Sequence, residues 1–331
     1  MTLRVGVIGA GYATGSHLPV YAELPGVELV ALATAHADTA EAVASRFGAR
    51  PHVGFAALCA DPDVDLVDIA TRPSRHQEMV EAALAAGKDV LCEAPLALTV
   101  GDGEALVKAA TAAGRSGWVD MQSRFWPGLQ ELHRLVADGY LGTVENVVAT
   151  AFYPTFTRPE AVAASGWCAD AADGASSLRV HGLHTADLLR WIFGELDVVG
   201  GTVATRLAEW PGGRAATSVD SAAFSALLPD GAVCSVHTSW VAHHGDGWRL
   251  VAHGSAGTLV ATAAGHTGHF PVRLQGARAA DPGLTDLVVP GDEPATHPFA
   301  ELVRRIAAGG AGVPTFADGV AALQVAEEVE R

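Results

Sequence analysis

The sequence has few cysteines and few basic side chains, and each shortage argues against a class of protein. Its four cysteines are scattered and form no C-x-x-C pair, which argues against a zinc ribbon or a disulfide scaffold and favours a reducing, cytoplasmic location. Only 21 Lys and Arg stand against 37 Asp and Glu, so the formal net charge is −16. Because nucleic acids and anionic membranes bind clustered basic side chains, we expect neither as a partner.

Long apolar runs are also missing. No apolar stretch approaches the ~20 residues that span a bilayer, and the first residues do not have the pattern of a secretory signal. The chain is long, with 331 residues, and 49% of them are hydrophobic. This is enough for a large core and predicts two domains.

A glycine-rich turn stands near the start of the chain. The apolar run Leu3–Ile8 predicts a buried parallel strand, which ends in Gly9-x-Gly11 before a helix-like segment. The first glycine permits a tight turn, and the second leaves room for a pyrophosphate at the positive helix N-terminus. The third glycine of the usual pattern is replaced by Thr14. In this context we predict a dinucleotide-binding loop made of Gly9, Ala10, Gly11, Tyr12 and Ala13.

The second predicted strand, Val27–Thr34, bears on the choice of cofactor. An NAD site usually has an acidic residue at the tip of this strand, to accept hydrogen bonds from the ribose 2′-hydroxyl. Here the tip carries none, and Asp38 fits a helix cap better than a ribose contact. Thr34 and His36 are candidates for contact with a 2′-phosphate. The sequence therefore favours NADP(H) over NAD(H) by a small margin.

Strands and helices alternate through the first 122 residues. The apolar segments Val64–Thr71, Asp89–Glu93 and Trp118–Gln122 are separated by helical patterns, one from Ser74 and one capped by Thr99. This alternation predicts a doubly wound parallel sheet with right-handed crossovers.

The pattern changes in the second half. A helix is expected over Phe125–Tyr140 and another over His184–Phe193, and a third over Phe299–Ala308 is followed by a helical tail. Segments with strand character are separated by turn signals such as Pro229-Asp230-Gly231. They are Val144–Tyr153, Val198–Leu207, Asp220–Leu228, Ala232–Val241, Trp248–His253 and Thr258–Ala261.

Several motifs in order resemble the Gfo/Idh/MocA oxidoreductases. They are GAGYATGSHLP, ATRPSRH, CEAPLALT, SRFWP, HGLHTADLLRWIFGE and PTFADGVAALQVAEEV. The resemblance covers nearly the whole chain. It implies an α/β protein with a Rossmann domain over residues 1–122 and a C-terminal α/β domain over 123–331. The open, mostly antiparallel sheet of that second domain often mediates oligomerisation, which implies a homodimer or homotetramer.

Two positions depart from the family pattern. The family motif Glu-Lys-Pro places a lysine by the nicotinamide and the substrate oxygen, where its charge stabilises the developing oxyanion. Here the motif is Glu93-Ala94-Pro95, and the Ala94 methyl can do neither. The family also has an Asp four residues before a His, and Val180 stands in that place before His184.

The resemblance and the strand ends together suggest site residues. His184 and His181 are the catalytic candidates, with a satisfied structural histidine as the alternative for each. Spacing brings both near Asp187, but this set is too weak for us to predict a metal site. Arg179 meets an acidic substrate group or, as we favour, lies at the surface. Arg124 and Trp167 are further substrate candidates, and Thr71, Arg72, Pro73, His76, Glu93, Ala94 and Gln122 complete the predicted cofactor set.

Three functions fit these features. The first is hydride transfer between NAD(P) and a small polar alcohol or ketone, with a histidine as acid–base group. The second is reduction of an imine or a conjugated C=C bond, for which a lysine is not required. The third is a non-catalytic sensor or regulator that binds a dinucleotide. Non-redox chemistry with transient use of the cofactor is a further alternative, and we favour an oxidoreductase.

Overall fold

The computed structural model describes residues 2–157, 166–288 and 297–331. Within these ranges the chain forms two compact units, one of residues 1–121 and 299–321 and the other of residues 122–298 and 322–331. From the sequence we expect one boundary between two domains, after residue 122. In the structure, a late segment returns to the first unit, and the last helix begins in one unit and ends in the other.

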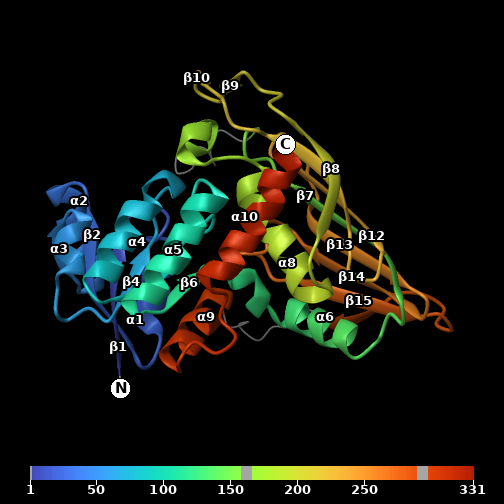
Figure 1. Cartoon of the computed structure of the whole chain (residues 1–331), viewed down its shortest axis with the longest axis horizontal. Coiled ribbons are helices and arrows are strands. Elements are labelled where there is room, and N and C mark those ends of the chain that lie inside the picture. The colour runs from blue at the N-terminus through green and yellow to red at the C-terminus, as the bar shows by residue number, and fades with distance from the viewer. Residues whose placement is uncertain (1, 158–165, 289–296) are drawn as a thin grey trace. The chain divides into compact units, whose positions relative to one another are not determined.

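The first unit, whose early strands and helices are blue to teal in Figure 1, is built on a parallel sheet of six strands. Their order is β3-β2-β1-β4-β5-β6. The order reverses at β1, as expected for a doubly wound fold. Because the crossover helices bury both faces, the central strands are almost wholly apolar. The strands are β1 (Leu3–Ile8), β2 (Val27–Thr34), β3 (Arg50–Val53), β4 (Leu66–Ile69), β5 (Asp89–Cys92) and β6 (Gly117–Val119).

Helices connect these strands. The connecting helices are α1 (His17–Glu23), α2 (Ala37–Phe47), α3 (Phe55–Cys59), α4 (His76–Ala85) and α5 (Val100–Ala113), whereas α9 (Pro298–Ala307) and α10 (Phe316–Glu330) come late in the chain. Thr99 caps α5 as predicted, because its side chain accepts a hydrogen bond from the backbone of Asp102. The predicted helix from Ser74 is instead one 3₁₀ turn, Pro73–Arg75, followed by α4. Strand β3 and helix α3 were not predicted.

The second unit contains an eight-stranded sheet in the order β16-β15-β14-β13-β7-β12-β11-β8. All its pairs are antiparallel except β7 with β12. Its strands are β7 (Val144–Phe152), β8 (Asp197–Ala204), β11 (Ser221–Leu227), β12 (Val233–Ser239), β13 (Gly247–Gly254), β14 (Gly257–Ala263), β15 (Arg273–Arg278) and β16 (Thr285–Val288). The last two were not predicted, nor was the short pair β9 (Glu209–Trp210) and β10 (Arg214–Ala215).

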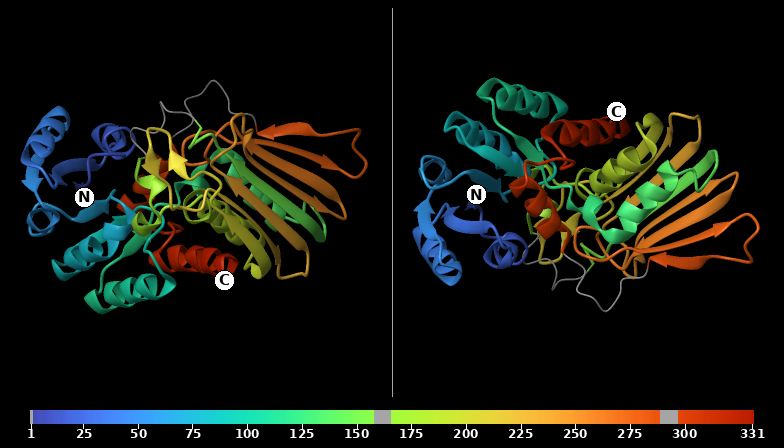
Figure 2. Two further views of the ribbon diagram at one scale, coloured as in Figure 1. Left: turned by 90° about the horizontal axis from the view of Figure 1, so that it is seen from above. Right: turned by 90° about the horizontal axis from the view of Figure 1, so that it is seen from below.

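One face of this sheet is covered by helices. Both views of Figure 2 show α6 (Pro127–Ala137) and α8 (Leu183–Phe193) on the same side. Side chains on the strands alternate accordingly, since Val147, Ala149 and Ala151 of β7 are buried while Val148 is 43% exposed. The expected helix Phe125–Tyr140 is shorter than predicted, because a 3₁₀ turn, Gln122–Phe125, precedes α6. A single π-helical turn, Leu178–Gly182, leads into α8.

Among the described residues, no helix is both long and apolar enough to cross a membrane. All four cysteines are free thiols and buried.

Candidate functional site

The first glycine of the loop after β1 is required by the backbone. Gly9 has a φ of +111°, and a Cβ at this position would lie 2.3 Å from the carbonyl oxygen of Ala70. Only glycine fits such a turn without strain. At Gly11, by contrast, an added Cβ meets nothing within 4 Å. The surface above Gly11 is therefore open, which fits the close approach of a dinucleotide phosphate.

The rest of the loop differs from the expected immediate start of a helix. Residues 11–16 form successive turns, and α1 begins only at His17. The carbonyl oxygen of buried Ala13 accepts hydrogen bonds from the amides of His17 and Leu18, at 3.0 and 2.9 Å. The hydroxyl of Thr14 donates to the carbonyl of Ala10. Thr14 thus closes the loop where the usual pattern has a third glycine.

The tip of β2 is the predicted site of cofactor discrimination. The Thr34 hydroxyl donates to the carbonyl of His36 at 2.7 Å, and the His36 side chain is exposed. His36, not Asp38, occupies the N-cap of α2, so the predicted cap at Asp38 is wrong. Asp38 lies in the first turn of the helix, where a carboxylate is favoured by the helix dipole.

His76 holds two predicted cofactor segments in place. The ring is completely buried, with Nδ1 3.0 Å from the carbonyl of Pro95 and Nε2 3.2 Å from the carbonyl of Thr71. Burial lowers the pKa of the ring. The imidazole therefore links the ends of β4 and β5 internally. The adjoining Arg72 side chain is exposed and Pro73 is buried.

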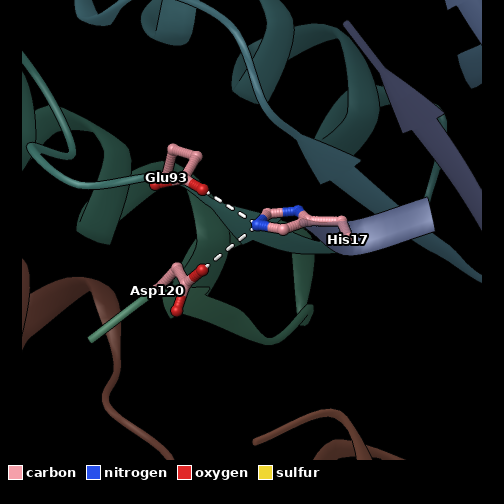
Figure 3. A group of neighbouring side chains, drawn as sticks. All are labelled: His17, Glu93 and Asp120. Carbon is pink, nitrogen blue, oxygen red and sulfur yellow. Dashed lines mark ion pairs between the residues drawn. The ribbon is translucent and has the colours of Figure 1, made fainter. Parts of the chain in front are cut away.

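The ends of β4, β5 and β6 bring together a group of buried and partly buried polar side chains, of which only Glu93 was predicted from the sequence. His17 is completely buried, and its Nδ1 lies 2.8 Å from Asp68. Its Nε2 lies 2.9 Å from Glu93 and 3.4 Å from Asp120 (Figure 3). Tyr21 donates a hydrogen bond to Asp68 at 3.0 Å. We call His17, Asp68, Glu93 and Asp120 the buried acid–histidine group.

The charges in this group are coupled. Burial alone lowers the pKa of His17, but the carboxylates of Asp68, Asp120 and Glu93 raise it well above its usual value. Burial and the charge of Asp120 raise the pKa of Glu93 to about 7, against the lowering effect of His17. A carboxyl at the end of β5 therefore exchanges its proton near neutral pH.

The same atoms satisfy the spacing of a metal site. Nε2 of His17 and oxygens of Glu93 and Asp120 all lie within 4.8 Å of one another. However, the 2.9 Å contact between His17 and Glu93 is that of a direct ion pair, and ligands held at 2.0–2.2 Å around a tetrahedral ion lie roughly 3.3 Å apart. The geometry fits a protonated imidazole between carboxylates.

Two arginines proposed for substrate contact are engaged within the second unit. Arg124 is buried and binds the carboxylate of Asp187 with two hydrogen bonds, at 2.8 and 2.5 Å. Arg179 pairs with Glu330 at 2.5 Å, and both side chains are partly exposed. Both charges are balanced within the chain, which weakens the case for an acidic substrate group. Trp167 lies partly buried against the core, and Gln122 is buried in the turn before α6.

Histidines cluster in the second unit. The His266 ring lies 4.7 Å from those of both His181 and His184, and 5.6 Å from that of His269. Tyr153 packs edge-on against His181 at 4.4 Å. The two predicted catalytic histidines are therefore close together. His266 was not predicted from the sequence, because the loop after β14 carries no recognisable motif.

Only weak features of the sequence indicate the other site residues that were not predicted. Asp68 is a charged residue inside the apolar run VDLVDIA, and a buried charge needs a partner. His17 belongs to the quoted motif GSHLP, and Asp120 follows β6 directly. Only the fold places their side chains together.

Comparison with known proteins agrees with this architecture. Residues 3–121 match a family model described as "Oxidoreductase family, NAD-binding Rossmann fold", and residues 129–260 match the "GFO/IDH/MocA C-terminal domain". Inositol 2-dehydrogenase of Rhizobium meliloti is 27% identical over 335 residues, which cover 100% of this chain and 97% of that protein.

Solved structures agree as well. An oxidoreductase domain protein from Kribbella flavida superposes with a TM-score of 0.89 at 29% identity, covering 100% of this chain and 96% of its own. A levoglucosan dehydrogenase in complex with NADH and levoglucosan gives 0.88 at 24% identity over the same shares of the two chains. At that identity the second likeness shows the fold alone.

Proposed function

Because the chain belongs to the GFO/IDH/MocA oxidoreductase family, we propose that it transfers hydride between a nicotinamide dinucleotide and a small, polar, sugar-like substrate. The observation that carries the proposal is the match of both domains to the family, together with the backbone at Gly9 that only glycine can adopt. Two relatives named for a sugar or cyclitol substrate support the substrate class: the inositol 2-dehydrogenase above, and a levoglucosan dehydrogenase of Pseudarthrobacter phenanthrenivorans that is 26% identical over 285 residues.

The dinucleotide would be held by the loop Gly9–Ala13, by the end of β4 with Arg72, and by Glu93 at the end of β5. Nicotinamide supplies the hydride acceptor or donor. Since β2 ends at Thr34 and is followed by His36 without a carboxylate at its tip, we propose that NADPH binds at least as tightly as NADH. This preference is decided by titrating each nucleotide and comparing the two dissociation constants.

The acid–base group in this proposal is His184. It stands in the first turn of α8 and is 8% exposed. A neutral imidazole accepts the proton of a substrate hydroxyl as hydride leaves the carbon, and returns it in the reverse direction. With Ala94 at the lysine position, no ammonium stabilises the oxyanion from that side, and we expect a modest rate.

The test combines binding and turnover. Nicotinamide fluorescence is followed while NADH or NADPH is added, and absorbance at 340 nm is followed with myo-inositol, levoglucosan, imines and enones. Failure of both nucleotides to bind overturns the proposal. Tight binding without oxidation or reduction across the panel favours the sensor or regulator. His184→Ala is expected to lower kcat by at least 100-fold.

A further inference from the structure

The hydrogen-bonding of His181 fixes the position of its proton. The indole N–H of Trp240 lies 2.6 Å from Nδ1 of His181. An indole N–H only donates, so Nδ1 must be the acceptor and the neutral ring carries its hydrogen on Nε2. Protonation of Nδ1 would set two N–H groups against each other. His181 is therefore a poor acid–base group.

His266 is fixed in the same way by a different donor. The backbone N–H of Gly268 donates to Nδ1 of His266 at 3.2 Å. A Cβ at position 268 would lie 2.9 Å from Nδ1, so glycine lets the backbone approach. Nε2 of His266 is buried and has no hydrogen-bond partner among the residues that the structure describes. The ring thus holds an unused donor.

The loop that carries His266 is firmly anchored. The His266 carbonyl accepts hydrogen bonds from the amides of His269 and Phe270, at 2.9 and 3.0 Å. The next residue, Thr267, is 1% exposed, and its hydroxyl lies 2.9 Å from that of Ser123. Trp126 donates its indole N–H to the Thr267 carbonyl. The imidazole is therefore held before any ligand binds.

We propose that His181 and His266 are permanently neutral hydrogen-bond donors, whose Nε2–H groups bind an oxygen atom of the substrate, and that they do not transfer its proton. This inference rests on the proposed function and assigns the roles within it. Burial lowers the pKa of His181 to about 3 and that of His266 well below its usual value, with further lowering from His184 and His269. Two neutral rings also avoid the repulsion between imidazolium ions.

The surroundings define the substrate class. The hydroxyl of Tyr153, a residue only 5% exposed, has no hydrogen-bond partner within the described ranges and adds another neutral group beside His181. The nearby arginines are balanced by carboxylates, Arg124 by Asp187 and Arg179 by Glu330. Neutral donors suit carbonyl and hydroxyl oxygens. The site therefore favours an uncharged polyhydroxylated substrate over its carboxylated counterpart.

The primary experiment needs no substrate. The protein is labelled with ¹⁵N-histidine, and the ring nitrogens are followed by NMR from pH 5 to 8, with His181→Gln and His266→Gln to assign the signals. We expect both residues to remain in the neutral Nε2–H form across this range. Titration of either ring between pH 5 and 8, or a hydrogen on Nδ1, would overturn the proposal.

A matched pair of tryptophan variants tests whether Trp240 fixes the position of the proton on His181. Trp240→Phe removes the donor to Nδ1 of His181 and is expected to shift a measurable share of the His181 ring to the Nδ1–H form in the same NMR experiment. Trp248→Phe removes a similarly buried indole that donates to Thr185 at 3.1 Å, and should leave His181 unchanged. An equal response to both variants would contradict the role of Trp240.

Whether His266 binds an oxygen atom of the substrate is tested with any substrate that the panel identifies. His266→Gln keeps an N–H near the place of Nε2 and should retain kcat/KM within about threefold, whereas His266→Ala should lose tenfold or more. No loss in His266→Ala, or equal loss in both, overturns the binding role. D-Glucuronate should have at least a tenfold higher KM than D-glucose. If neither nucleotide binds, the proposed function fails while the NMR result on both rings still stands.

Discussion

In the first unit, Nε2 of His17 lies 2.9 Å from a carboxylate oxygen of Glu93. The contact joins the first residue of α1 to the end of β5, next to Ala94. A carboxyl whose pKa is raised to about 7 therefore lies at the end of β5, and its protonation is expected to affect stability.

The first prediction concerns pH. Burial and Asp120 raise the pKa of Glu93 from 4.5 to about 7. The folded state thus keeps a proton that the unfolded chain releases, so this stabilisation is complete below pH 4.5 and is lost as the pH rises through 7. We expect the Tm to fall by about 5 °C between pH 5 and 7, and Glu93→Gln to remove most of that fall.

Thermal unfolding at several pH values measures this effect. Glu104→Gln is the control, because Glu104 is exposed and only 3.9 Å from Lys108 in a surface pair. The raised pKa of His17 acts in the same direction at higher pH, so a decline above pH 7 should persist in Glu93→Gln. An unchanged profile between pH 5 and 7 would contradict the assignment.

The second prediction concerns a positive charge introduced at Ala94. Ala94 is partly exposed at the end of β5, next to Glu93. We expect Ala94→Lys to raise kcat for oxidation of a polyol by tenfold or more, because an ammonium stabilises the developing alkoxide. Ala94→Met supplies similar bulk without charge and should not accelerate the reaction. A loss of native activity in Ala94→Lys alone would instead favour an imine or enone substrate.

The third prediction separates two glycines of one loop. Gly9→Ala places a methyl 2.3 Å from the Ala70 carbonyl, so we expect destabilisation of about 1–3 kcal/mol and loss of nucleotide binding. The methyl added in Gly11→Ala has no neighbouring atom within 4 Å. This variant should therefore keep the wild-type Tm, while its affinity for NADH and NADPH falls by tenfold or more. Unchanged affinity in Gly11→Ala would show that phosphate does not approach there.

The fourth prediction concerns the pair of Arg124 and Asp187. Their side chains are 10% and 1% exposed, and removing one partner of a buried pair leaves an uncompensated charge. Asp187→Ala is expected to cost about 3–5 kcal/mol in urea unfolding. Glu131→Ala, which breaks the exposed pair with Arg134, should cost less than about 1 kcal/mol. Equal effects would exclude this account.

The fifth prediction concerns the uncovered face of the second sheet. Val148, Leu227 and Val233 are 43%, 37% and 55% exposed, and Leu227 lies beside Val233 across β11 and β12. An apolar patch of this kind suits contact with a second copy of the chain. We expect light scattering to show a dimer or tetramer, and Val233→Asp to shift it toward monomer. Val53→Asp, at a 57% exposed valine of β3, is the control and should not.

Structural features that depend on a local pattern of residue types were predicted from the sequence. Alternation of apolar strands and helices identified the parallel sheet, and Pro229-Asp230-Gly231 correctly marked the hairpin between β11 and β12. Strands β15 and β16 were missed, because the exposed edge segment 285–288 has little apolar pattern. Element ends shifted where turns replaced helix, as at Gln122–Phe125.

The chemistry of the candidate site depends on distant contacts and was less predictable. His181 was found through a motif, but its tautomer is set by Trp240, 59 residues away in the chain. The proton of Glu93 depends on His17 and Asp120, which lie on different elements. A pattern of residue types suggests such side chains as candidates, but only their three-dimensional neighbours determine the protonation state.

The return of residues 299–321 to the first unit has a consequence for synthesis. The ring of Phe299 stacks on His17 at 3.9 Å, and the amide of Val119 donates to the carbonyl of Pro314 at 3.0 Å. Domains generally fold as units while the chain emerges from the ribosome. This first unit cannot be completed until nearly the whole chain has emerged. We therefore expect nascent chains that stop before Phe299 to leave the histidine and its carboxylates accessible to water.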